Sequence, residues 1–130
     1  VYGPRQIKTG SMATVIGIFE DQYSKGKHLT IVKPGTQTRR FTHIHDTVNI
    51  CYYAWNRNKC KHYSISSKKS YSIREVAQMF KTRVKYLKSR PGERYASALT
   101  TFSENNRIIS KFGKIKLKDY ITSFIKDQNL

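Results

Sequence analysis

The sequence has few cysteines and no long apolar run, and each shortage argues against a class of protein. Only Cys51 and Cys60 occur in 130 residues, too few for a small secreted fold held by disulfides, so we expect reduced thiols. No stretch approaches the roughly 20 apolar residues of a membrane-spanning helix, and the N-terminus lacks the basic and then apolar order of a signal peptide. We therefore expect a cytoplasmic protein with no membrane segment.

Acidic residues are also scarce. Eight Asp and Glu stand against 25 Lys and Arg, which gives a formal net charge of +17. Such an excess attracts phosphate-bearing partners, whether nucleic acid, an anionic membrane surface or a phosphorylated small molecule, although lysines also solvate ordinary surfaces. The few carboxylates leave little material for acid and base catalysis, and no Ser-His-Asp order is present. No self-contained active site is visible.

Aromatic residues, by contrast, are plentiful. Nine Tyr, six Phe and one Trp, with an apolar share of 38%, supply the large buried surfaces that disordered chains lack. The length suits one folded unit, so we expect residues 1–130 to form a single domain. Because the chain begins with Val and opens directly on VYGPRQ, we expect it to be a piece of a longer protein.

Apolar spacing predicts the helices. The first spans Ser11–Lys25, with Ser11 as N-cap and Gly26 as the stop signal. A second begins at Asp46 as N-cap, and its apolar face comprises Val48, Cys51, Tyr52 and Trp55. Ser72 and Glu75 match a capping box that starts a third helix through Phe80.

Two further helices and four short strands complete the prediction. The helices are 103–112 and 116–127, the latter with Leu117, Tyr120, Ile121 and Phe124 on its apolar face; the strands are 28–33, 38–44, 61–66 and 84–88. The fold class is therefore mixed α/β, with about five helices and too few strands for a complete doubly wound sheet. No G-x-G-x-x-G follows a strand, so the chain offers no dinucleotide cradle of its own.

Two basic constellations suggest alternatives from other classes. The side chains of His43, His45, Cys60 and His62 could ligate zinc, but their spacing matches no standard finger, and packing or surface histidines are the simpler interpretation. The segment 59–72 interleaves lysines with tyrosines that could stack on bases, but no recognised nucleic-acid motif accompanies it. A small zinc protein and a basic nucleic-acid-binding module remain open on these grounds.

Arginines in two separate loops offer another possibility. Arg39 and Arg40 follow the Pro34-Gly35 turn, and Arg90 lies in a Pro-Gly loop. Guanidinium groups bind phosphate oxygens with two donors and keep their charge at any working pH. Two such loops could grip a diphosphate from both sides, while the simpler interpretation is that these arginines face solvent.

Five segments together resemble a known family. VYGPRQ (1–6), the stretch YSKGKHLTIVKPGTQTRRFTHIHD (23–46), YSIREVAQMF (71–80), RPGERYASAL (90–99) and LKDYITSFI (117–125) occur in that order. They resemble the C-terminal half of NAD-dependent nucleotide-sugar epimerases and dehydratases, in the extended short-chain dehydrogenase/reductase family, as in UDP-glucose 4-epimerase-like enzymes. The resemblance covers essentially the whole chain.

The resemblance implies that two domains of the full-length enzyme have different roles. An N-terminal Rossmann domain holds NAD and carries a catalytic Tyr-x-x-x-Lys pair, and the C-terminal part binds the nucleotide diphosphate of the sugar. This chain matches only the second part. The resemblance therefore implies no cofactor bound by this chain alone, no catalytic residue within it, and no activity without the missing Rossmann domain.

The resemblance also assigns substrate-binding residues. Arg39 matches the arginine of a Q-x-R-D-F segment and Arg90 that of an R-x-G-E/D segment, both of which approach the diphosphate. Leu29, Thr30 and Ile31 match a stretch whose backbone lies along the base, and Glu93 matches the acidic position of the R-x-G-E segment. Three positions depart from the family pattern towards basic residues, which leaves the sugar open: Arg40, His43 and His45.

We therefore expect a nucleotide-sugar-binding domain without its cofactor domain. The expected partners are a nucleotide diphosphate sugar and the Rossmann domain, and we do not expect nucleic acid or a membrane. Because the missing domain would leave apolar surface uncovered, self-association is also expected.

Overall fold

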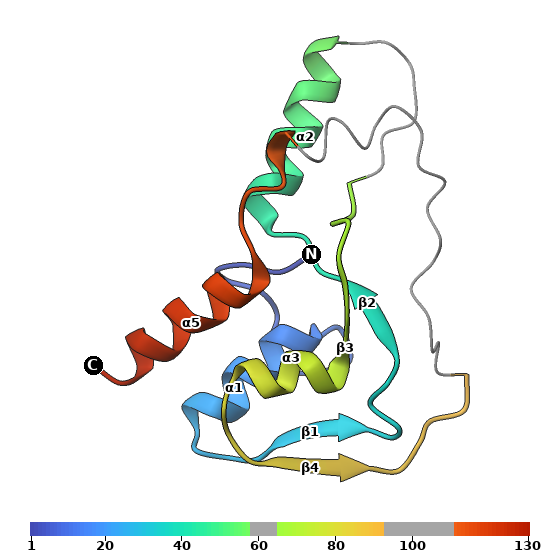
Figure 1. Ribbon diagram of the computed structural model, residues 1–130, viewed down its shortest axis with the longest axis vertical. Helices are drawn as coiled ribbons and strands as arrows, with labels where there is room; N and C mark the ends of the chain where they lie inside the picture. The colour runs from blue at the N-terminus through green and yellow to red at the C-terminus, as the bar shows by residue number, and fades with distance from the viewer. Residues whose placement is uncertain (58–64, 93–110) are drawn as a thin grey trace.

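The computed structural model describes residues 1–57, 65–92 and 111–130 (Figure 1). These ranges contain four helices and four short strands, so the predicted mixed α/β class is confirmed, and the helix predicted over 103–112 lies almost entirely outside them. The elements in chain order are α1 (Val15–Ser24), β1 (Leu29–Val32), β2 (Thr38–Arg40), α2 (Ile44–Arg57), β3 (Ser70–Ser72), α3 (Ile73–Met79), β4 (Val84–Leu87) and α5 (Leu117–Gln128). None of the helices in these ranges is long and apolar enough to cross a membrane.

The strands form two separate pairs. β1 and β4 run parallel, with Leu29 opposite Val84, and β2 and β3 run antiparallel, with Arg39 opposite Tyr71. The strand predicted over 38–44 ends earlier than expected, at Arg40. Of the strand predicted over 61–66, residues 61–64 lie outside the described ranges and the last two are not in a strand.

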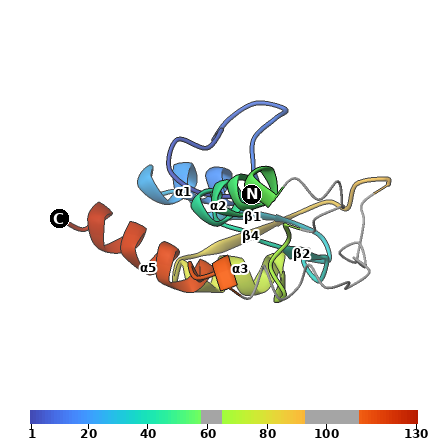
Figure 2. The same ribbon diagram turned by 90° about the horizontal axis from the view of Figure 1, so that it is seen from above.

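The β1–β4 pair lies between α1 and α3 when seen from above (Figure 2). Successive strand residues point to opposite faces, and β1 alternates accordingly: Leu29 and Ile31 are fully buried, whereas Thr30 and Val32 are half-buried. The buried members join one core with side chains from α1, α3 and α5, among them Phe19, Val76, Phe80 and Ile121. This core fixes the position of β1.

The N-cap of α1 is Thr14, and the prediction of Ser11 is wrong. The Thr14 hydroxyl accepts a hydrogen bond from the backbone amide of Gly17 at 3.0 Å, which satisfies one of the orphan donors at a helix start. Met12, counted on the predicted apolar face, is 76% exposed. The three residues after Ser11 form a turn and an extended link, which apolar periodicity alone does not distinguish from a helical turn.

The predicted capping box is confirmed at the start of α3. The Ser72 hydroxyl accepts from the Glu75 amide at 3.1 Å, and the Glu75 carboxylate accepts from the Ser72 amide at 2.6 Å. These hydrogen bonds lower the pKa of Glu75 below its usual value. The box joins β3 directly to α3 with no loop between them.

Two predictions about α2 are wrong. The helix begins at Ile44, so Asp46 lies in its first turn; the carboxylate is buried and accepts a hydrogen bond from the Ile115 amide at 3.1 Å. The predicted apolar face is exposed, with Val48 at 55%, Tyr52 at 68% and Trp55 at 82%. The helix projects away from the strands (Figure 1), which leaves that face uncovered by the described residues.

The prediction for α5 is confirmed. Leu117 and Ile121 are buried, and Tyr120 and Phe124 pack against the same core. The Tyr120 hydroxyl donates to the buried Glu20 carboxylate on α1 at 2.7 Å, and Lys8 pairs with that carboxylate at 3.2 Å. These contacts attach the last helix to the first.

Candidate functional site

A cavity of about 150 Å³ lies at the end of the β1–β4 pair. We call it the arginine cavity. Its polar lining residues come from three segments of the chain: Thr30, Gln37, Arg39 and Arg90. Apolar side chains of α1, Val32 on β1, Ile73 on α3 and Leu87 on β4 complete its wall. The structure therefore brings Arg39 and Arg90, which are distant in sequence, to one cavity.

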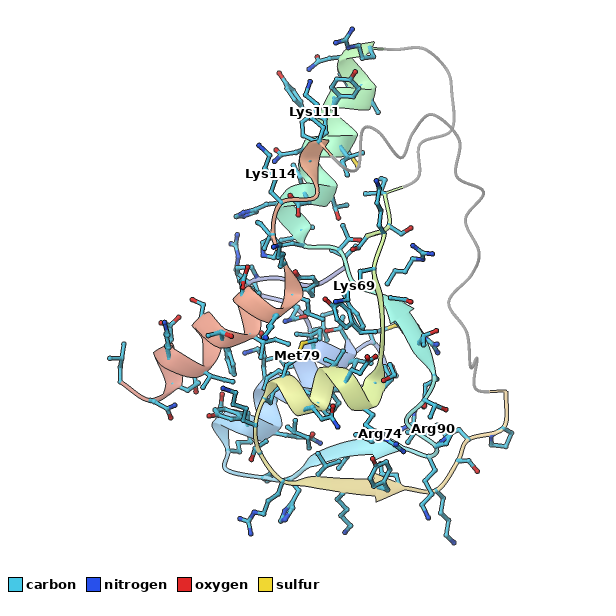
Figure 3. The ribbon with its side chains drawn as sticks, in the orientation of Figure 1. Lys69, Arg74, Met79, Arg90, Lys111 and Lys114 are labelled. Carbon is cyan, nitrogen blue, oxygen red and sulfur yellow. The ribbon has the colours of Figure 1, made fainter. Side chains whose placement is uncertain are left out.

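The parallel pairing of β1 with β4 explains this convergence. Parallel strands end at the same edge, and here Val32 lies opposite Leu87, with the Lys33 amide donating to the Leu87 carbonyl at 3.0 Å. The chain then turns into β2 from one strand and continues towards Arg90 from the other. Figure 3 shows Arg90 on the segment after β4, beside the connection between β1 and β2.

Neighbouring arginines on β2 have different surroundings. Arg39 lines the arginine cavity, and its Nη1 donates to the Thr38 carbonyl at 2.8 Å. The Nη1 of Arg40 donates to the carbonyls of Ser67 and Lys68 at 3.0 and 2.7 Å. The two side chains leave the strand on opposite faces, so Arg40 holds the segment before β3 and Arg39 faces the cavity.

The residues predicted to lie along a base occupy β1. Thr30 lines the arginine cavity, and Gln22 fixes it: its Nε2 donates to the Thr30 hydroxyl at 2.8 Å, and its Oε1 accepts from the Thr30 amide at 3.0 Å. The side chains of Leu29 and Ile31 point into the core, so only their backbones are available to a ligand. Glu93 lies outside the described residues.

Sequence reasoning missed Gln37, a polar residue of the cavity wall. Gln37 is 2% exposed, and its Nε2 donates to the Val32 carbonyl at 3.0 Å. In the sequence it stands between two threonines near a turn, where polar residues are usual and carry no sign of burial. The available signal was its place two residues before Arg39, as the glutamine of the Q-x-R-D-F segment, to which no role was assigned.

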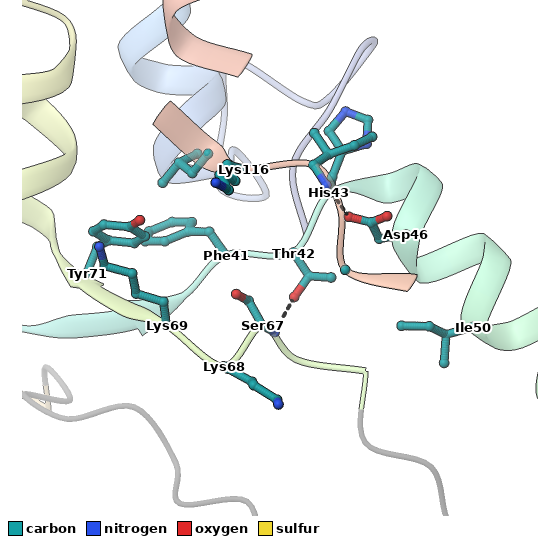
Figure 4. A pocket seen from close by; sticks show the side chains of 13 residues that line it. Phe41, Thr42, His43, Asp46, Ile50, Ser67, Lys68, Lys69, Tyr71 and Lys116 are labelled. Carbon is teal, nitrogen blue, oxygen red and sulfur yellow. Dashed lines mark hydrogen bonds between the residues drawn. The ribbon is translucent and has the colours of Figure 1, made fainter. Parts of the chain in front are cut away.

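A larger cavity of about 350 Å³ lies between the start of α2, the segment before β3 and the start of α5 (Figure 4). We call it the lysine cavity, because Lys68, Lys69 and Lys116 line it. Their amino groups point in different directions, and Lys69 Nζ lies 4.8 Å from the ring centre of Tyr71. The candidate zinc ligand His43 and part of the candidate nucleic-acid segment 59–72 lie here, whereas none of the predicted substrate-binding residues within the described ranges does.

The histidine pair lies at the junction between β2 and α2. The rings of His43 and His45 are 5.0 Å apart, and His43 Nδ1 accepts from the His45 amide at 3.2 Å. Burial and the neighbouring His45 lower the pKa of His43, against an opposing effect of Asp46. Within the described ranges no three His, Cys, Asp or Glu side chains could hold a metal ion together, and Cys60 and His62 lie outside those ranges.

The tyrosines of the core are not arranged as catalytic bases. Burial raises the pKa of Tyr2, and burial with the hydrogen bond to Glu20 raises that of Tyr120. A tyrosine base requires the opposite shift, towards the operating pH. Within the described part of the chain, moreover, no strand leads through a glycine-rich turn into a helix, so these residues do not fit a dinucleotide cofactor.

The fold is similar to part of the fold of several sugar-nucleotide epimerases. A UDP-glucose 4-epimerase of Thermotoga maritima with UDP-glucose superposes with a TM-score of 0.77 at 20% identity, over 96% of this chain and 42% of that one. A UDP-N-acetylglucosamine 4-epimerase of Methanobrevibacter ruminantium with UDP-N-acetylmuramic acid gives 0.79 at 23%, over 96% and 42%. A UDP-glucuronic acid 4-epimerase of Bacillus cereus with a fluorinated UDP-sugar and NAD gives 0.74 at 25%, over 97% and 42%.

The sequence agrees with this class. The profile of the NAD dependent epimerase/dehydratase family matches residues 1–66, half of the chain. The chain therefore belongs to the NAD-dependent epimerase/dehydratase family. It spans less than half the length of these structural relatives.

Proposed function

We propose that this chain binds the nucleotide diphosphate end of a nucleotide sugar in the arginine cavity. The observation that carries the proposal is that Arg39 from β2 and Arg90 from the segment after β4 line one cavity together with Thr30. Membership of the epimerase/dehydratase family and relatives solved with UDP-sugars support it. Arg39 and Arg90 would bind the diphosphate oxygens from two sides.

The guanidinium groups, the net charge of the chain and the size of the cavity all support binding of a diphosphate. Guanidinium groups offer planar pairs of donors that match phosphate oxygens, and the net charge of +17 favours the approach of an anion. A cavity of about 150 Å³ is smaller than the roughly 300–1,000 Å³ of sites that enclose a whole small-molecule ligand. The chain would thus hold one end of the ligand and leave the sugar to its partner.

The backbone of β1 supplies a second element of the site. The backbone of Leu29, Thr30 and Ile31 would lie along the base, held rigid by the buried side chains of the first and last and by Gln22 at the middle one. Glu93 is proposed as a further contact near Arg90. The binding energy of these remote groups would help to position the reacting carbon of the sugar.

The hydride chemistry would belong to the rest of the enzyme. A Rossmann domain with NAD and the catalytic Tyr-x-x-x-Lys pair would complete the site, in a UDP-glucose 4-epimerase-like enzyme or a dehydratase. NAD, when bound there, supplies the oxidation of the sugar and its reversal. This chain alone would bind the ligand and be inactive.

Calorimetric titration of the chain with UDP-glucose tests the proposal. The same protein is titrated with a DNA duplex over a range of salt concentrations, because nucleic-acid binding through phosphates weakens steeply with salt. We expect saturable UDP-glucose binding. Tight, strongly salt-dependent DNA binding without affinity for UDP-glucose would overturn the proposal in favour of a basic nucleic-acid-binding module.

A further inference from the structure

Gln37 is held rigidly in the wall of the arginine cavity. Its backbone carbonyl accepts from the Ile73 amide at 3.1 Å, its Nε2 donates to the Val32 carbonyl at 3.0 Å, and the residue is 2% exposed. Reversing the amide would set Oε1 against the Val32 carbonyl, two acceptors facing each other. The orientation of the amide is therefore fixed.

This orientation leaves a buried acceptor. Oε1 of Gln37 has no hydrogen-bond partner among the described residues. An unsatisfied buried acceptor costs about 1–3 kcal/mol, and such groups in folded proteins call for an explanation by function or by a bound molecule. A donor supplied by a ligand of the cavity would remove this cost.

We propose that Gln37 is a specificity residue that reads the nucleobase, with Oε1 accepting a hydrogen bond from the imide N3–H of uracil or thymine. The assignment depends on the proposed function, because it takes the ligand of the arginine cavity to be a nucleotide. A diphosphate oxygen is itself an acceptor and is repelled by Oε1, so the phosphates are matched to Arg39 and Arg90. The uncharged acceptor is matched to the uncharged donor of the base, which lies against β1 with Thr30.

The same hydrogen bond discriminates among bases. Cytosine carries a lone pair at N3 in place of the imide proton, so its N3 and Gln37 Oε1 are two acceptors in contact. Sites with buried polar groups reject ligands that leave those groups unpaired. Uridine and thymidine diphosphates are therefore favoured over cytidine diphosphate.

The approach of the base requires a small local movement. Oε1 has almost no accessible surface in this state, so a side chain of the cavity wall moves aside when the base enters. Leu87, at 36% exposure, and the exposed Arg90 lie in that wall with solvent on one side. The backbone of β1 and Gln37 itself stay in place.

Binding of UDP, 3-methyluridine diphosphate and CDP to the full chain tests the assignment. The wild type is expected to prefer UDP by about five-fold or more over both analogues, the range of one hydrogen bond. Gln37→Met, which keeps the length and removes the acceptor, is expected to abolish the preference.

Gln6→Met is the matched control. It also removes an amide whose buried Nε2 lacks a hydrogen-bond partner among the described residues and whose Oε1 accepts from the Thr14 hydroxyl at 2.9 Å, but Gln6 does not line the arginine cavity. It is expected to keep the preference for UDP. A merely structural effect of losing an amide would alter both variants in the same way.

Each of these binding measurements either supports or overturns the role assigned to Gln37. A wild type that binds 3-methyluridine diphosphate as tightly as UDP overturns the assignment, and so does a preference that persists in Gln37→Met. If that variant does not fold, the wild-type ratio of UDP to 3-methyluridine diphosphate binding decides. Absence of any UDP binding to the wild type overturns the proposed function, and the assignment with it.

Discussion

The arginine cavity and the lysine cavity both carry cationic side chains, and they differ in what holds them. Arg39 and Arg90 lie on the two segments that follow β1 and β4, and these strands end at the same edge of the parallel pair. The lysines of the larger cavity lie at its exposed rim, around a buried wall that contains Asp46 and His43. The first cavity has two guanidinium donors and no carboxylate in its described lining, whereas the second combines exposed lysines with a buried acid.

The two cavities show that the number of cationic side chains alone does not define an anion-binding site. A lysine on a flexible stem loses side-chain entropy when it is fixed, and a nearby carboxylate offsets its charge. Arg39, by contrast, lies on the short strand β2, which places it through the backbone. The net charge of the chain therefore describes its attraction to anions, and the geometry of β1, β2 and β4 gives the place at which we propose that one is held.

Replacing the arginines is the most direct test of the difference between the two cavities. Arg39→Ala and Arg90→Ala are each expected to weaken nucleotide-sugar binding by about 1.5–3 kcal/mol, because each removes hydrogen bonds to a charged group. Lys69→Ala and Lys116→Ala, the controls in the lysine cavity, are expected to change it by less than about 1 kcal/mol. Calorimetry measures all four, and equal losses in both cavities would refute the distinction.

Replacing Asp46 tests whether the buried acid of the lysine cavity stabilises the fold and takes no part in nucleotide binding. Asp46→Ala leaves the Ile115 amide without its acceptor in a partly buried setting, so we expect the free energy of unfolding to fall by about 1–3 kcal/mol. Nucleotide binding by the folded variant should be unchanged. Denaturant unfolding measures the effect, with the exposed Asp127→Ala as control; equal losses in the two variants would contradict a role for the buried carboxylate.

Thr42 ties two walls of the lysine cavity together. Its hydroxyl accepts from the Ser67 amide at 2.7 Å, shown as a dashed line in Figure 4. Thr42→Val is expected to lower the free energy of unfolding by about 0.5–1.5 kcal/mol without altering nucleotide affinity. The exposed Thr122→Val on α5 serves as control in the same unfolding experiment, and a loss of nucleotide affinity in Thr42→Val would argue that the larger cavity also takes part in binding.

Replacing His43 is expected to give the smallest effect, a change in how the free energy of unfolding depends on pH. Because its pKa is lowered in the folded state from an ordinary value of 6.5, the unfolded state binds more protons as the pH falls below that value. The free energy of unfolding should therefore decrease on acidification through and below 6.5, and His43→Gln should flatten this dependence. Urea unfolding between about pH 5 and pH 8 measures it, and the exposed His28→Gln should leave the slope intact.

Local signals in the sequence predicted local structure. The Ser72 and Glu75 pair defines its helix start within four residues, and the spacing of Leu117, Ile121 and Phe124 fits only one face of a helix. Both depend on neighbours in the chain and both are confirmed. Thr14 was missed because two hydroxyl residues precede the same apolar series, and periodicity does not choose between them.

Predictions that depended on distant partners were less secure. Asp46 resembled an N-cap, but its acceptor serves an amide 69 residues away, and the apolar stripe ending at Trp55 found no cover among the described residues. β3 was missed because Ser-Tyr-Ser has no strand pattern of its own and pairs only through β2. For the site, the resemblance gave roles to Arg39 and Arg90 but none to Gln37, the glutamine of the same Q-x-R-D-F segment.

The pairing of β1 with β4 has a kinetic consequence. Leu29 and Val84 meet only after a segment of more than fifty residues has closed, and contacts so distant in sequence form late and cost loop entropy. Arg39 and Arg90 share a cavity only once this closure is complete. Recovery of nucleotide affinity after dilution from denaturant should therefore lag behind the return of helical circular dichroism.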